Sequence, residues 1–246
     1  MLDPVVIFIA AVFLVAGLVK GVIGLGLPTI SMGLLAVIMP PAEAAALLIV
    51  PSLATNVWQM LAGPDLRPIL GRLWPTMLGV CAGTWAGAGL MSGAEGRLGT
   101  ALLGTALMAY ALTGLSSLRL SIGAAAERWL GPLAGGATGL ITAATGVFVI
   151  PAVPYLQAIG LEKDDLVQAL GLSFTVSTLA LAVNLATAGT FNLSVAGPSI
   201  VTLAVAGAGM WLGQELRARL SPAAFRVWFF IALFALGLYL LLRAAA

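Results

Sequence analysis

One lysine, Lys20, stands where a charge is unexpected. It is the only charged residue between Asp3 and Glu43, and its neighbours are apolar. A glycine-rich run, residues 21–28, follows it directly and ends in proline. A charge inside an apolar membrane segment is costly and marks a functional site by default, and a glycine-rich break opens backbone polar groups to a ligand. Cation and break together predict an anion site within a membrane. The alternative is that Lys20 extends to the bilayer surface.

A second break, residues 139–151, lies in the other half of the chain and also ends in proline. Helix N-termini present free N–H groups and a partial positive charge, which bind oxyanions without help from side chains. We expect the two breaks to meet near the midplane, with Lys20 facing Thr145. The two halves of the chain resemble each other at a fixed offset, which pairs Lys20 with Thr142. Only one side of the predicted site would therefore carry a charge. For single glycines and threonines, close packing and hydrogen bonds to their own helix are the alternatives.

Polar residues at helical spacing follow each break. Asn56 and Gln59 lie within one turn of each other, and Ser173 occupies a similar place in the second half. Neutral amides are poorly placed against lipid, so they would either join helices or donate to a ligand. The residues predicted to bind substrate are Lys20, Gly24, Gly26, Thr29, Asn56, Gln59, Thr142, Thr145, Gly146 and Ser173.

The composition is that of a polytopic all-α membrane protein. Apolar residues make up 61% of the 246 and charged residues only 8%, against about 25% charged in soluble domains. There is no histidine, and Cys81 is the only cysteine. We therefore expect no metal site, no cofactor and no enzyme activity. The net charge of +2, without a basic cluster, gives no indication of nucleic-acid binding.

The apolar segments follow one order twice: long, short, long, long, long. This order predicts two membrane repeats, residues 1–120 and 121–246, which together form one transport domain. Each repeat would hold a broken or re-entrant helix pair and three spanning helices. The predicted segments are 5–20, 28–39, 42–62, 73–92, 98–117, 130–148, 150–160, 166–188, 194–214 and 223–242.

Loop charges choose between two chain paths. If each short segment returns toward the side where its break was entered, only Arg97 and Arg243 face one side of the membrane. If each long segment and the short segment after it together cross the membrane once, the loop lysines and arginines divide evenly between its two sides. The positive-inside rule favours the first path, with inverted repeats and both termini outside the cytoplasm. In that path the charges on the cytoplasmic side are Arg67, Arg72, Arg119, Arg128, Lys163, Arg217, Arg219 and Arg226.

No carboxylate lies inside a long segment; Glu43, at the start of the third segment, comes nearest. It either complements its helix dipole or serves as a proton-coupling group. A cytoplasm-negative potential by itself drives monovalent anions outward, so export would need no coupling ion.

At these residues the chain resembles the TauE/SafE family of sulfite and organosulfonate exporters. The resemblance rests on the stretch from Gly17 to Pro28, the segment that reaches Asn56, and the second break ending at Pro151, and it covers nearly the whole chain. It implies transport of sulfite, an organosulfonate or another small sulfur-containing anion across the bacterial inner membrane. Import is the alternative direction, and an intramembrane scaffold or enzyme is the alternative class. A homodimer is one assembly that the sequence leaves open.

Overall fold

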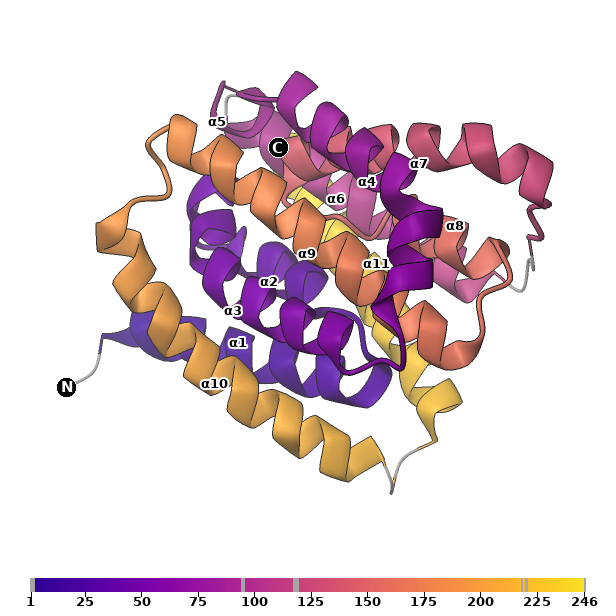
Figure 1. Ribbon diagram of the computed structural model, residues 1–246. Coiled ribbons are helices and arrows are strands. Elements are labelled where there is room, and N and C mark those ends of the chain that lie inside the picture. Colours follow the sequence, from indigo (N-terminus) through magenta and orange to yellow (C-terminus); the bar gives the residue numbers. More distant parts are fainter. Residues whose placement is uncertain (1–2, 94–95, 117–119, 218, 220, 246) are drawn as a thin grey trace.

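The computed structural model describes residues 3–93, 96–116, 120–217, 219 and 221–245, and within this part the fold is helical without strands (Figure 1). The predicted segment 98–117 ends, and Arg119 lies, outside the described residues. In chain order the helices are α1 (Pro4–Ile23), α2 (Leu27–Leu35), α3 (Pro41–Leu61), α4 (Leu66–Ala86), α5 (Leu90–Gly93), α6 (Gly96–Leu115), α7 (Ala124–Thr145), α8 (Ala152–Ala158), α9 (Lys163–Thr187), α10 (Leu193–Arg217) and α11 (Pro222–Ala245).

Each predicted apolar segment corresponds to a helix, and the differences lie at the boundaries. α4 begins seven residues before the predicted start, at Leu66 rather than residue 73, because the Asp65 carboxylate accepts a hydrogen bond from the Arg67 backbone N–H at 3.0 Å and caps the helix. α7 begins at Ala124, whereas the apolar run began at residue 130. The short α5 was not predicted, because four residues are too few to show a periodic pattern.

Five helices in the described part of the chain have the length and composition of membrane spans. Within the described residues, α1, α3, α6, α9 and α11 are long and apolar enough to cross a bilayer. Tryptophan side chains lie on the outer surface of the bundle, where a soluble fold would expose such apolar area to water. These exposed residues are Trp58, Trp74, Trp85, Trp129, Trp211 and Trp228.

Glycines allow two helix pairs to pack at backbone distance. A Cβ on Gly17 of α1 would lie 2.1 Å from the Ala206 carbonyl oxygen of α10, and one on Gly21 would lie 2.2 Å from that of Met210. Both residue numbers rise together, so α1 and α10 run parallel, side by side in Figure 1. Contacts of the same kind hold α4 against α7, also in parallel. Small residues are the usual means of such close approach in membranes.

Two other pairs run antiparallel. Gln59, near the end of α3, donates to the Val167 carbonyl oxygen near the start of α9 at 3.1 Å. Gln168 returns a hydrogen bond to the Met60 carbonyl oxygen at 2.8 Å. α6 and α11 also pack closely, with Gly104 and Gly237 facing each other.

Contacts among α1, α3 and α10 determine the path through the first break. Ser199, early in α10, donates to the Leu47 carbonyl oxygen in the first half of α3 at 2.8 Å. Farther along α10, Met210 packs on α1 at Gly21, next to Lys20, which bonds to the second half of α3. α3 therefore runs parallel to α10, and so to α1. The short α2 carries the chain back between them, as in the first of the two predicted paths.

Candidate anion site

The first break is made by glycine conformations that other residues rarely adopt. α1 ends at Gly24, whose φ is 76°, and its N–H donates to the Lys20 carbonyl oxygen at 2.8 Å. Gly26 follows with a φ of 109°, and α2 starts at once with Pro28 in its first turn. Proline suits this position because the first-turn N–H has no partner within the helix. The break therefore leaves Lys20 in the last turn of α1.

Lys20 is buried in the protein interior, with 5% of its surface exposed. Its ammonium donates to the Thr55 hydroxyl at 3.1 Å and to the Asn56 side-chain carbonyl oxygen of α3. Thr55 donates its own proton to the Pro51 carbonyl oxygen at 2.7 Å, so its oxygen is free to accept from lysine. No ion pair involves Lys20 within the described part of the chain. The cation is therefore surrounded by neutral acceptors.

The Asn56 amide links this cation to the second half of the chain. Its Nδ2 donates to the Ser52 hydroxyl at 3.0 Å. The Ser52 and Thr178 hydroxyls lie 3.3 Å apart, which connects α3 to α9. Lys20, Asn56, Ser52 and Thr178 thus form one buried network across three helices, which we call the Lys20 network. Removing one member leaves another buried polar group without its partner.

Pro51, inside α3, explains why α10 is held beside this network. Proline has no N–H, so the carbonyl oxygen of Leu47, four residues earlier, loses its helical donor. The Ser199 hydroxyl of α10 supplies a replacement at 2.8 Å. The hydrogen bond from Ser199 therefore holds the middle of α3, where Pro51 interrupts the helical hydrogen bonds, against α10. At this level the polar face of α3 meets α1.

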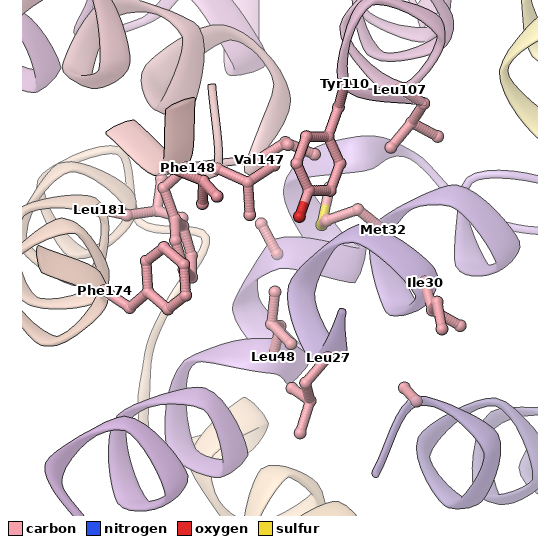
Figure 2. Packing of buried hydrophobic residues seen from close by; sticks show 14 of the residues in the cluster. Leu27, Ile30, Met32, Leu48, Leu107, Tyr110, Val147, Phe148, Phe174 and Leu181 are labelled. Carbon is pink, nitrogen blue, oxygen red and sulfur yellow. The ribbon is translucent and has the colours of Figure 1, made fainter. Parts of the chain in front are cut away.

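The second break has similar backbone geometry and no charge. Gly146 has a φ of 70°, and its N–H donates to the Thr142 carbonyl oxygen at 2.8 Å. Thr142 and Thr145 are buried, and both hydroxyls donate to carbonyl oxygens of their own helix, at 2.7 and 2.6 Å. Met32 of α2 lies against Gly146, where a Cβ would be 2.8 Å from its terminal methyl carbon. Figure 2 shows Met32, Tyr110 and Val147 among the buried side chains of this core.

The predicted site residues separate into several environments. Lys20 and Asn56 are in direct contact, but no hydrogen bond in the described part of the chain joins Lys20 to Thr145. Thr29 donates to the Gly26 carbonyl oxygen at 3.0 Å and so closes the first turn of α2. The buried Ser173 hydroxyl has no hydrogen-bond partner in the part of the chain that the structure describes.

A cavity of about 830 Å³ reaches the first break from the end toward which α1, α3 and α6 run. Gly24 and Gln59 form part of its wall. Gly24 follows Lys20 by four residues and Gln59 follows Asn56 by three, so each lies about one helical turn from the Lys20 network. The sequence indicated Gln59 but neither Tyr110 nor Arg226, which also line the cavity. These two are far apart in sequence, and only packing of α6 against α11 brings them together.

The family model for the sulfite exporter TauE/SafE matches residues 9–240. This match covers both breaks and all the predicted site residues. The chain belongs to the sulfite exporter TauE/SafE family. No curated protein and no solved structure matches it.

Membership of the TauE/SafE family makes the chain a multi-pass membrane transporter, and the family implies a small sulfur-containing anion as substrate. The resemblance stated from the glycine-rich breaks is confirmed. A transporter family agrees with the expectation that the protein is not an enzyme.

Proposed function

We propose that the protein exports sulfite or an organosulfonate across the bacterial inner membrane and that Lys20 binds the anionic group. The observation that carries the proposal is the burial of Lys20 among neutral partners. Burying an ion without a counter-charge costs several kcal/mol, about 3–5 when one partner of a pair is missing. A passing anion would supply that counter-charge, and the adjacent N-terminus of α2 would add its partial positive charge. The other predicted residues, Ser173 and the Thr142–Gly146 segment among them, would contact the anion during passage.

Alternating access between two inverted repeats, residues 1–120 and 121–246, is the transport mechanism we propose. Gly17 and Gly139 are separated by the same offset as Lys20 and Thr142, and the run AGTWAG at residues 82–87 resembles AGMWLG at residues 208–213, which pairs Gly83 with Gly209. Gly17 packs on α10 and Gly139 on α4, while Gly83 packs on α7 and Gly209 on α1. Equivalent residues thus make equivalent contacts in the two halves, as a two-fold axis in the membrane plane would require.

Export driven by the membrane potential fits the charges near the site. Moving a monovalent anion through 100 mV is worth about 2.3 kcal/mol, or about 50-fold in concentration. Glu43 is exposed at the start of α3, at the end opposite Gln59. In the described chain no carboxylate bonds to the Lys20 network. This arrangement favours uncoupled export over proton-coupled import.

The test is anion flux into proteoliposomes with Lys20→Met and, as control, Lys163→Met, which removes an exposed lysine. The panel is sulfite, sulfoacetate, thiosulfate, sulfate and chloride. We expect Lys20→Met to lower flux of the preferred anion at least about 100-fold, because more than 2.7 kcal/mol of charge interaction is lost. Its melting temperature should stay close to that of the wild type, because removal of a buried charge offsets the loss of the hydrogen bonds that Lys20 donates. Normal flux by Lys20→Met would refute the role of Lys20.

A further inference from the structure

The 830 Å³ cavity is lined by a charged residue and by apolar side chains, none of which belongs to the Lys20 network. Among the described residues that line it, Arg226, at the start of α11, is the only charged one. Among the described residues, Arg226 has no hydrogen bond or ion pair. A guanidinium presents a planar array of donors suited to oxyanions. The cavity therefore has one open cationic group of its own.

A polar group at the inner side of the cavity is also without a partner. Tyr110 of α6 is 2% exposed, and its hydroxyl makes no hydrogen bond to any described residue. Figure 2 shows its ring extending from α6 toward Met32 in the core. Arg226 is close enough to Tyr110 for an electrostatic interaction. Arg226 is therefore the group of this cavity that is open to an anion, and its charge acts close to the unpaired Tyr110 hydroxyl.

Most of the remaining wall is apolar and comes from the ends of several helices. It includes Leu120, Val153, Leu166, Leu170 and Phe230. A small inorganic anion gains nothing from such a surface, because it carries no apolar area to bury. An anion with an organic group would bury that group here and place its charge at Arg226.

We propose that this cavity is an access site that holds an organic anion one turn before the Lys20 network, with its anionic group on Arg226 and its apolar group on the cavity wall. The inference rests on the proposed function, since it assumes that an anion travels to Lys20. It assigns the substrate class within that function: sulfonates that carry an apolar group are preferred over sulfite.

The test is equilibrium binding of a radiolabelled n-alkanesulfonate series, from methanesulfonate to butanesulfonate, to the full-length protein in detergent, with sulfite as the reference. Each methylene placed on the wall should tighten binding up to about fourfold. Arg226→Gln should weaken binding of every member at least tenfold. Leu166→Trp, which fills the cavity, should lower the ratio of butanesulfonate to methanesulfonate affinity. Leu179→Trp, on the exposed side of the same helix, is the control and should leave the ratio unchanged.

Affinity that does not depend on chain length, or that survives Arg226→Gln, would overturn the access site. Flux measurements distinguish failure of the access site from failure of the proposed function. If sulfite flux depends on Lys20 while chain length has no effect, the proposed function stands and the access site does not. If the series binds as expected but no anion crosses the membrane, the access site stands and the transport proposal fails.

Discussion

At the scale of single residues, the anion-binding role that we propose for the Lys20 ammonium depends on the neutrality of its partners. Its acceptors, the Thr55 hydroxyl and the Asn56 amide oxygen, orient the ammonium without neutralising it. A carboxylate in the same place would form a buried ion pair and compete with any substrate. Under the proposed function, neutral acceptors would leave the positive charge available to a substrate anion.

Asn56→Asp tests this difference with an almost isosteric change. We expect the new carboxylate to pair with Lys20 and to lower anion flux at least about tenfold, because displacing it would cost more than 1.4 kcal/mol. The measurement is proteoliposome flux together with the melting temperature, which the new pair should not lower. Ser52→Ala, which removes a partner of Asn56 and adds no charge, is the control. Flux by Asn56→Asp equal to that of Ser52→Ala would show that the neutrality of this acceptor does not matter.

At the scale of helices, α1 and α7, which end at the two breaks, are positioned by close packing on α10 and α4. This packing depends on glycines that face a carbonyl of the partner helix. Gly209 of α10 faces the Leu14 carbonyl oxygen, which a Cβ would approach to 2.2 Å. Gly207, two residues earlier, faces open space. The same helix thus offers a critical glycine and a dispensable one.

Gly209→Ala should destabilise the protein, because backbone atoms cannot yield as a flexible side chain can. Overpacking of this kind costs about 1–3 kcal/mol. Gly207→Ala should be neutral or stabilising by up to about 1 kcal/mol, because alanine favours a helix over glycine. Thermal unfolding in detergent compares the two variants. Equal melting temperatures would mean that α1 and α10 do not pack at backbone distance.

At the scale of the whole molecule, helix directions and loop charges together predict how the protein sits in the membrane. α1, α3 and α10 run parallel, so the α3–α4 loop and the α9–α10 loop lie at opposite ends of the bundle. The positive-inside rule places the α3–α4 loop, next to Arg67, in the cytoplasm. Both termini would then lie outside it.

Cysteine labelling tests this orientation. In a Cys81→Ser background, Ala188→Cys should react with a membrane-impermeant maleimide in intact spheroplasts, and Ala62→Cys only after lysis, because the bilayer shields the cytoplasmic loop; both alanines are exposed. The reverse pattern would invert the proposed topology and place the 830 Å³ cavity on the outer side.

Transport driven by potential alone is a second prediction at this scale. Anion efflux from vesicles should follow a clamped potential and not a pH gradient, because no carboxylate bonds to the Lys20 network in the described chain. Glu43→Gln should leave the efflux unchanged. Efflux that follows the pH gradient, and loses that dependence in Glu43→Gln, would establish proton coupling instead.

The sequence by itself determined the membrane class, the helical segments, both breaks, the isolation of Lys20 and the family. These features are local: apolar runs, glycine and proline act within a few residues, and a lone charge needs no partner to be noticed. Tertiary structure decided that Lys20 bonds to Asn56 on α3 and that Met32 lies against the second break. It also decided that Arg226 and Tyr110 share a cavity. These pairings join helices distant in sequence, and packing between helices, which no local pattern encodes, selects among them.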